Sequence, residues 1–575
     1  MTPSTRWTLS ASKVLAAILA SSAALCVATL IASMAQNYYL LPFWDEWDEL
    51  RFLRRFYESR LTLADFWVPH IEHRLFLPRI FFLADQVLFG GTKFFLYASI
   101  IGIQALNWRV FVRIVARHGR MDRAGVIIVA AIGAILLFSA AQWQNFAWSF
   151  QIPFVGVYLL AIASFLALGD AARALNERGK SAMWTRAGAA ILFGAGATAM
   201  MANGVLVWPL LVALALVLRL PVRIVVLIAA TGAFLIWLYF EGYHSPPGHA
   251  DPIASLASPD SVLMYAAAYL GNPLQTFGLL PCMVLGGVGM AATAGVAIHQ
   301  VVSREPPHEV RAALAAVLLF VVATAFVTAL GRINFTTQQA LSSRYVTPAL
   351  IFWMALFVYG LVVRPRDRNW AWGARAVLFT IIGLLAANAA ATHRDALDQF
   401  ARIRFVSDQA ALALALGVAD PATLKEVHSR PADVLEGAEF LRAHRPSVFM
   451  IPELAFIGKS LDEAFRIRPS SECSGAFDTM EAIPGIDATR VSGWAWDTVR
   501  ERPFDTILLA DERIVGVAKG GALRSDVPAN RPEIKSRRAG WRGLIRGVIS
   551  PLAAFGVDLG ARTACRIPGD PKIAR

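Results

Sequence analysis

The sequence lacks several features that mark common classes of soluble protein. It has no glycine-rich phosphate loop, no nucleophile elbow and no cysteine cluster with metal-ligand spacing. Its net charge is +13, yet no basic stripe interleaved with aromatic residues lies on a soluble helix. We therefore exclude nucleic acid as a partner. No internal repeat or low-complexity tract stands out, so a repeat architecture is also excluded.

Charged residues are scarce, and apolar residues occur in long blocks. Only 17% of the 575 residues are charged and 56% are hydrophobic. A run of about 18 or more apolar residues is long enough to cross a membrane. Much of the positive charge lies in short loops between these runs, as the positive-inside rule expects. We predict about eleven spans, the first a signal anchor: 14–35, 94–115, 124–141, 152–168, 187–201, 205–218, 225–240, 279–301, 312–330, 346–363 and 374–391.

The expected spans contain few groups that carry chemistry. Carboxylates in the middle of a span mark proton-coupled transporters, and their absence here counts against an ion-driven carrier. Of the four cysteines, Cys26 and Cys282 lie in spans and are expected to pack there. Cys473 and Cys565 lie in the polar C-terminal part, and they can pair if that part is extracytoplasmic.

The pattern predicts a mainly α fold in three parts. Residues 1–392 form a polytopic transmembrane bundle with an outer catalytic loop at 36–93. Residues 393–468 form a helical connector, with helices at 395–417 and 431–444. Residues 469–575 form a small β-sandwich, a candidate for carbohydrate binding. Its expected strands are 491–496, 506–509 and 514–518, with a hairpin turn at 511–513.

The first outer loop begins with carboxylates among tryptophans. These residues are Trp44, Asp45, Glu46, Trp47, Asp48 and Glu49. On a helix, Asp45 shares a face with Asp48 and Glu49. One such carboxylate can act as a general base that removes a proton from an acceptor hydroxyl. The alternative is a solvated acidic junction. Because tryptophans flank the carboxylates at a span end, we favour a functional role.

The same loop continues with a second polar group, followed by basic residues. His70, His73 and Arg74 have the spacing of one helical face. Histidine and carboxylate ligands suit zinc or manganese, but the HxxH pattern is weak by itself. An anion pocket is the better hypothesis, with Arg74 gripping a phosphate through two N–H groups. The alternative is an ordinary interfacial helix start. Leu50, Leu53, Phe56 and Tyr57 at helical intervals among the arginines predict an amphipathic helix in the interface.

A third polar group precedes the tenth expected span. Arg332 and Arg344 bracket a short loop that ends at Tyr345. Arginine binds phosphate through two N–H groups and keeps its charge near lipid. The alternative is an interfacial anchor of arginine and tyrosine. Asn145, in the loop after the third span, is expected to line the same cavity.

The layout of the membrane part resembles the GT-C superfamily of membrane glycosyltransferases. The resemblance rests on Trp44-Asp45-Glu46-Trp47-Asp48 at the end of span one and on the outer loop ending at Ser343-Arg344-Tyr345. It covers residues 14–391 in layout rather than in residue identity. The C-terminal part, with Gly493-Trp494-Ala495-Trp496-Asp497, is similar to β domains of bacterial cell-envelope glycosyltransferases. Its tryptophans either stack on sugars or, as we favour, form the core.

The resemblance implies an inverting enzyme with a polyprenyl-phosphate sugar donor. Asp45 matches the family's catalytic base best, followed by Asp48, with Glu46 beside them. Arg74, Arg344 and Arg332 would stabilise the leaving phosphate. Trp44 and the polar residues already named would contact substrate.

It further implies a bacterial inner-membrane protein with a cytoplasmic N-terminus and a periplasmic C-terminal domain. The expected partners are the lipid-linked donor, a cell-envelope glycan or lipid acceptor, and membrane lipids. We expect no cofactor, although some family members use a divalent metal. The alternatives are a flippase for lipid-linked sugars and a non-catalytic envelope glycan assembly protein.

Overall fold

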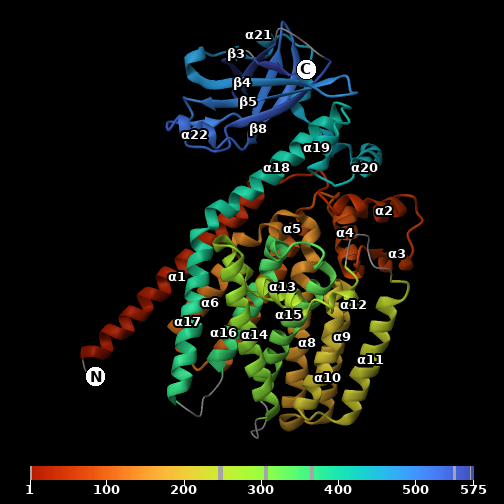
Figure 1. Ribbon diagram of the computed structural model, residues 1–575, viewed down its shortest axis with the longest axis vertical. Helices are drawn as coiled ribbons and strands as arrows, with labels where there is room; N and C mark the ends of the chain where they lie inside the picture. Colours follow the sequence, from red (N-terminus) through yellow and green to blue (C-terminus); the bar gives the residue numbers. More distant parts are fainter. Residues whose placement is uncertain are drawn as a thin grey trace. The chain divides into compact units, whose positions relative to one another are not determined.

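The computed structural model describes residues 3–243, 250–302, 308–362, 368–547, 552–569 and 571–574. The fold is mainly helical, with a β-rich C-terminal part (Figure 1). The chain divides into two compact units. The first unit comprises Met1–Ala35 and Leu61–Leu397, and the second comprises Gln36–Arg60 and Asp398–Arg575. The two units are described separately.

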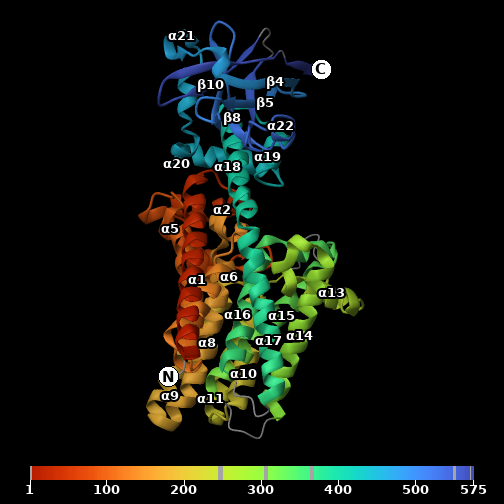
Figure 2. The same cartoon turned by 90° about the vertical axis from the view of Figure 1, so that its left-hand side faces the viewer.

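The first unit is a bundle of helices, drawn from red to green in Figure 2. The bounds are α1 (Pro3–Gln36), α3 (Leu63–Trp67), α4 (Phe76–Leu88), α5 (Phe94–His118), α6 (Arg123–Leu137), α7 (Trp143–Ala147), α8 (Ile152–Glu177), α9 (Lys180–Met200), α10 (Val207–Val217), α11 (Val222–Phe240), α12 (Pro252–Ser255), α13 (Pro259–Gly271), α14 (Leu279–Val302), α15 (Glu309–Arg332), α16 (Val346–Val362) and α17 (Arg368–Ala391). A two-stranded hairpin of β1 (Pro69–His70) and β2 (His73–Arg74) follows α3.

Nine helices in the described part of the chain are long and apolar enough to cross a membrane. The prediction of a multi-pass membrane protein is therefore confirmed. Two expected spans, 187–201 and 205–218, fall in α9 and in the helical stretch Ala202–Val217, which are not among the nine. Ala202–Val217 is shorter than the roughly 20 residues that a crossing needs. The count of eleven spans stays a prediction.

Burial separates the inner helices of the bundle from the outer ones. In Ser343–Val362, which contains α16, 89% of the most apolar window is buried, against 17% in Gly373–Ala391 of α17. A helix that is apolar all round can face either protein or lipid, so its composition does not show which it faces. The structure places α16 inside the bundle and leaves much of α17 exposed.

Two glycines allow α13 and α14 to pack closely. A Cβ on Gly271 would lie 1.8 Å from the Cys282 carbonyl oxygen, and one on Gly286 would lie 1.9 Å from the Ala267 carbonyl oxygen. Such distances are far inside van der Waals contact. Small residues allow helix backbones in membranes to approach in this way.

We expect Gly286→Ala to destabilise the bundle by about 1–3 kcal/mol, the usual cost of overpacking. The added methyl group would meet backbone, which cannot rotate away as a side chain can. Thermal unfolding of the detergent-solubilised chain, followed by tryptophan fluorescence, measures the effect. Gly287→Ala is the matched control, because nothing lies within 4 Å of a Cβ at that position. Equal melting temperatures for the two variants would contradict the close packing of α13 on α14.

The helices of the second unit are α2 (Glu46–Tyr57), α18 (His393–Ala415), α19 (Pro421–Lys425), α20 (Pro431–His444), α21 (Leu461–Ala464) and α22 (Asp526–Asn530). α18 and α20 confirm the two helices expected in the connector. α2 is amphipathic, but its apolar side packs against α20. A Cβ on Gly437 of α20 would lie 2.9 Å from both Trp47 and Leu50. The interfacial helix expected in this loop is therefore partly covered by protein.

The C-terminal strands form one ten-stranded sheet, rather than the two packed sheets of the expected sandwich. The hairpin turn expected at 511–513 is confirmed, since Ala510 pairs with Ile514. The order is β12-β4-β5-β9-β8-β7-β10-β11-β3, with β6 paired to β5. The bounds are β3 (Arg466–Ile467), β4 (Cys473–Ala482), β5 (Ala488–Asp497), β6 (Arg502–Pro503), β7 (Thr506–Ala510), β8 (Ile514–Ala522), β9 (Gly540–Arg546), β10 (Ala553–Asp558), β11 (Thr563–Ile567) and β12 (Lys572–Ala574).

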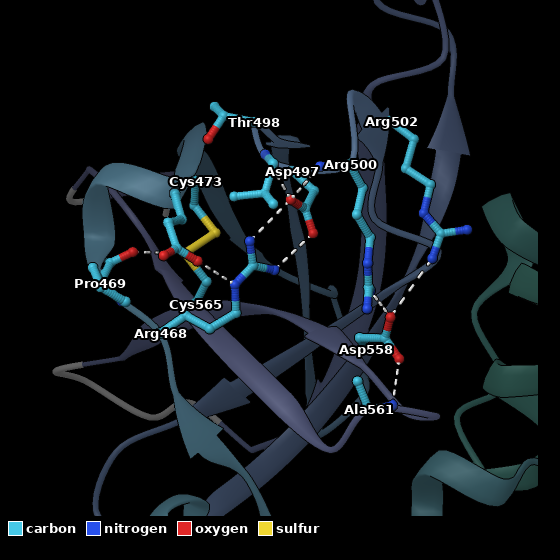
Figure 3. A network of polar contacts seen from close by, with 12 residues as sticks. Arg468, Pro469, Cys473, Asp497, Thr498, Arg500, Arg502, Asp558, Ala561 and Cys565 are labelled. Carbon is cyan, nitrogen blue, oxygen red and sulfur yellow. Dashed lines mark hydrogen bonds and ion pairs between the residues drawn. A yellow bond between two sulfur atoms is a disulfide. The ribbon is translucent and has the colours of Figure 1, made fainter.

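The sheet curls so that strands near its two ends meet. Cys473 of β4 and Cys565 of β11 form a disulfide, although five strands lie between β4 and β11 in the sheet order (Figure 3). Both cysteines belong to the same core cluster as Phe477 and Trp541. Curling lets one sheet enclose a core by itself, which is why no second sheet is needed.

We expect the double variant Cys473→Ala/Cys565→Ala to lower the free energy of unfolding of the second unit by about 2–4 kcal/mol, because the disulfide closes a long loop. The two cysteines are 92 residues apart. Circular dichroism of the full chain in detergent measures the shift, with Cys26→Ala as control. Mass spectrometry after alkylation without reduction provides the counter-test. Alkylation of both Cys473 and Cys565 would contradict a disulfide in the native protein.

The C-terminal tryptophans are buried, as favoured from the sequence, Trp541 in the core of the sheet and Trp494 and Trp496 in a second cluster with Val527, Ile534 and Ala539. Trp494, Trp496 and Trp541 are 7%, 4% and 1% exposed. Asp497, which follows Trp496, accepts two hydrogen bonds from Arg468, of 2.7 and 3.0 Å (Figure 3). Burial alone would raise the pKa of Asp497, but the hydrogen bonds from Arg468 and from the Val499 and Arg500 amides together outweigh it and lower that pKa. The Trp-Ala-Trp-Asp segment is therefore structural.

Candidate functional site

The predicted carboxylates lie at the start of α2, in the second unit. Asp45 is the residue before the helix, and its side chain does not cap the helix. Glu46 accepts a hydrogen bond from the Phe43 amide at 3.1 Å, which holds the turn into α2. The structure therefore gives Glu46 a local role and places Asp45 where the chain enters the helix.

Trp44 has an unusual backbone conformation beside Asp45. Its φ is 49°, in the left-handed region that costs an L-residue about 1–2 kcal/mol. The Trp44 amide donates to the Val427 carbonyl at 2.7 Å, which helps to hold this conformation. The ring remains 42% exposed. Strained residues with exposed side chains are concentrated at binding sites, so this observation favours Trp44 as a contact residue.

Asp48 is held by two basic groups of the connector. Arg430 Nη2 lies 2.7 Å from Asp48 Oδ1, and His428 Nε2 lies 3.6 Å from Asp48 Oδ2. Burial alone would lower the pKa of His428, but Asp48 and the Arg430 carbonyl outweigh it and raise that pKa. The charge of Asp48 is thus compensated within its own unit. These ion pairs attach α2 to the connector, which favours a structural role for Asp48.

Asp48, His428 and Asp433 also have ligand atoms within 4.8 Å of one another, the spacing of a metal site. However, Arg430 pairs with Asp48 and also lies 2.7 Å from Asp433. Its guanidinium therefore supplies the positive charge that a cation would bring. We assign this group to ion pairing, and the expectation that no metal is required stays a prediction.

The two histidines of the outer loop face each other across a hairpin, not along a helix. His70 pairs with His73 in the β1–β2 ladder, and Pro69 pairs with Arg74. Ile71, in the turn, has a φ of 52°. The helical interpretation of His70, His73 and Arg74 is therefore wrong. A proline followed by a tight turn favours the extended strands, and the three-residue spacing by itself could not distinguish the two.

Arg74 anchors this hairpin to the end of α11. It donates to the main-chain carbonyls of Trp67 and Tyr239, each at 2.8 Å, and to that of Glu241. Its side chain also lies over the Trp67 ring, 5.7 Å from the centroid. The residue is 7% exposed. These contacts favour a structural role for Arg74 over the phosphate-binding role expected from its position.

Arg332, at the end of α15, binds the same hairpin. Its Nη2 lies 2.9 Å from Glu72 Oε1, and Glu72 lies 3.5 Å from His73 Nε2. The pair joins the C-terminal end of α15 to the turn of the hairpin. Because Glu72 compensates its charge, Arg332 is a weaker candidate for binding an anion than an arginine without a carboxylate.

The loop that carries Arg344 is held in place by α7. Gln144 Oε1 accepts from the Ser343 hydroxyl at 2.9 Å and from the Arg344 amide at 3.2 Å. Asn145 Nδ2 donates to the Arg344 carbonyl at 2.9 Å and to Thr347 Oγ1 at 2.6 Å. Asn145 therefore contacts the Arg344 backbone, and a cavity that both residues line stays a prediction. Asn145 positions the backbone of Arg344, because the side-chain amide nitrogen of Asn145 donates to the Arg344 carbonyl.

The Arg344 guanidinium has no carboxylate partner among the residues that the structure describes. Its Nε is buried without a hydrogen-bond partner, and its side chain lies over the Tyr345 ring, 5.4 Å from the centroid. The Tyr345 ring packs in turn against Tyr269, with centroids 4.8 Å apart. A half-buried cation that is positioned by its neighbours but lacks a counter-ion is suited to bind an anion.

Two tyrosines of α13 belong to this group and were missed from the sequence. Tyr265 and Tyr269 are 1% and 2% exposed, and the Tyr265 hydroxyl donates to Gln339 Oε1 at 3.2 Å. Both Arg332 and Arg344 lie near enough to act electrostatically on Tyr265. In the sequence, the only signal was that Tyr265 and Tyr269 are four residues apart and so share one helix face. That spacing is also typical of core packing.

The predicted site residues therefore fall into two groups. The acidic group, of Trp44, Asp45, Glu46 and Asp48, belongs to the second unit. The basic group, of His70, His73, Arg74, Asn145, Arg332, Arg344 and Tyr345, belongs to the first unit. No family model matches the chain, and neither curated proteins nor solved structures gave a match. The residues themselves carry the functional argument.

Proposed function

We propose that this chain is a membrane glycosyltransferase. It would transfer a sugar from a polyprenyl-phosphate donor to a cell-envelope glycan or lipid acceptor on the extracytoplasmic side of a bacterial inner membrane. The observation that carries the proposal is the Arg344 guanidinium, which has no carboxylate partner among the described residues and a buried Nε without a hydrogen-bond partner. A lipid phosphate would supply both the charge and the acceptor oxygens.

The membrane setting supports a lipid-linked anion over a soluble one. Arg344 comes directly before α16, the most buried of the candidate spans. Arginine remains charged near lipid and grips phosphate through two parallel N–H groups. The nearby Ser343 and Asn145 side chains are committed to holding the loop, so the guanidinium supplies the donors to the ligand.

The carboxylate beside Trp44 supports the choice of a transferase over a passive carrier. In the proposed reaction, Asp45 takes the proton of an acceptor hydroxyl. The hydroxyl oxygen forms a bond to the anomeric carbon, and the bond from that carbon to the phosphate oxygen breaks with inversion. The lipid phosphate leaves with the electron pair, and Arg344 stabilises its charge. No metal or cofactor is required in this scheme.

A transfer assay with purified protein tests the proposal. Full-length protein in nanodiscs is given polyprenyl-phosphate donors that carry radiolabelled sugars, together with lipid and glycan acceptors. We expect label to move from the donor to an acceptor and free polyprenyl phosphate to appear in equal amount. Matched reactions with and without EDTA test for a divalent metal.

Two outcomes would contradict the proposal. Movement of the intact labelled donor between leaflets without any transfer would favour the flippase. Donor binding without either transfer or movement would favour a non-catalytic assembly protein. A panel of several sugars is needed, because the proposal specifies a phosphate-binding arginine and does not specify the sugar.

A further inference from the structure

A pocket in the second unit lies outside all the residues discussed above. Its volume is about 260 Å³, slightly below the range of about 300–1,000 Å³ that is usual for drug-sized ligands. The wall residues come from the start of the second unit, from α18, from the segment before β3 and from β8. Those used in the argument are Tyr38, Leu41, Ser407, Asp408, Glu453 and Lys519.

An ion pair lines the pocket and leaves an acceptor without a partner. Lys519 Nζ lies 2.6 Å from Glu453 Oε1, which also accepts from the Thr506 hydroxyl at 3.0 Å. Glu453 is 5% exposed, and its Oε2 is buried with no hydrogen-bond partner. Burial alone would raise the pKa of Glu453, but the charge of Lys519 and the hydrogen bonds to the carboxylate together outweigh it and lower that pKa, so Oε2 is a charged acceptor.

A second lining residue also has an unmet hydrogen-bonding group. Ser407 of α18 is 1% exposed, and its hydroxyl has no hydrogen-bond partner. Buried polar atoms are nearly always paired in native proteins, so two such atoms in one pocket point to a ligand that pairs with them. Asp408, the next residue, is half-exposed and supplies a further acceptor beside Arg404, 3.6 Å away.

The chemistry of the wall restricts the class of ligand. An anion would face the carboxylates of Glu453 and Asp408, and a cation would face the ammonium of Lys519. A hydroxyl group can both donate to Glu453 Oε2 and accept from Lys519 or Ser407. Tyr38 and Leu41 add an apolar wall, which suits the C–H face of a ring.

We propose that this pocket binds a neutral sugar residue, with hydroxyl groups bonded to Glu453, Ser407 and Lys519 and the ring against Tyr38 and Leu41. The proposal is independent of the transfer reaction, because none of these residues has a role in the proposed reaction. It replaces the C-terminal tryptophans as the carbohydrate-binding feature of this part of the chain.

Ligand-observed NMR and calorimetry on the full chain test the proposal. The detergent must carry no sugar head group, since such a detergent would compete. The probes are the methyl glycosides of glucose, galactose, mannose, rhamnose and N-acetylglucosamine. Glucuronate and glucosamine serve as charged comparisons. We expect at least one neutral glycoside to bind more tightly than either charged sugar.

Pocket variants then separate specific binding from general affinity for sugars. We expect Glu453→Gln to weaken binding about 10- to 100-fold and Ser407→Ala about 2- to 10-fold, as for lost charged and neutral hydrogen bonds. Asp526→Asn is the control, because Asp526 is an exposed carboxylate of the same unit, paired with Arg524. Ser407→Ala keeps the test valid if Glu453→Gln misfolds, since it removes only one oxygen. No binding by any neutral glycoside, tighter binding of a charged sugar, or unchanged binding in both variants would overturn the proposal.

Discussion

Replacing Asp45 with asparagine is expected to lower the rate of sugar transfer by about 10²- to 10⁴-fold, the usual contribution of a general base. Asparagine has nearly the same shape but cannot accept the acceptor's proton. Because Asp45 does not cap α2 through its side chain, the fold should survive the change. Initial rates with a saturating lipid donor measure the effect, and donor binding measured in parallel should be unchanged.

Two further variants decide which carboxylate acts. Asp48→Asn should have a smaller effect on the rate, because Asp48 is held by Arg430 and His428, but it should lower the melting temperature. Glu58→Gln, at the other end of α2, is the matched control and should change neither quantity. A larger loss of activity in Asp48→Asn than in Asp45→Asn would exchange their roles. Full transfer activity in both variants would rule out both carboxylates as the general base.

The second large effect is expected at Arg344. Arg344→Gln should lower transfer about 10²- to 10³-fold, as for the loss of one donor to a developing negative charge. Arg344→Lys should recover only part of the loss, because lysine keeps the charge but not the two parallel N–H groups. Transfer rates and donor affinity, measured over a range of salt concentrations, test both statements.

Arg332 provides the comparison, since it belongs to the same group but is paired with Glu72. We expect Arg332→Gln to reduce thermal stability more than turnover, because it removes the ion pair between Arg332 and the mostly buried Glu72. The reverse pattern, with Arg344→Gln active and Arg332→Gln inactive at normal stability, would move the anion-binding role to Arg332.

Several features of the fold follow from local sequence patterns. The long apolar runs predicted a multi-pass membrane protein, and the helices at 395–417 and 431–444 formed as expected. The turn at 511–513 also lies at the position that its polar residues predicted. These predictions hold because apolar length and turn chemistry are properties of neighbouring residues.

The roles of single site residues could not be read in the same way. The spacing of His70 and His73 fits one helix face, yet the two residues face each other across a hairpin. Arg74 and Arg344 look alike in sequence. The Arg74 guanidinium donates to main-chain carbonyls, whereas the Arg344 guanidinium has no carboxylate partner in the described part of the chain. The partners that make this difference lie far away along the chain.

The sequence by itself determined that the chain is a membrane protein with a polar C-terminal part, because hydrophobic length and composition are local quantities. Only the tertiary structure decided which charges are compensated. Asp48 meets Arg430 and Arg332 meets Glu72 across hundreds of residues, whereas the described fold brings no carboxylate to Arg344. It also decided that the curled sheet encloses Trp541, whereas Trp494 and Trp496 are buried against Val527, Ile534 and Ala539. Long-range pairing depends on how helices and strands pack, and packing is not encoded in the spacing of neighbouring residues.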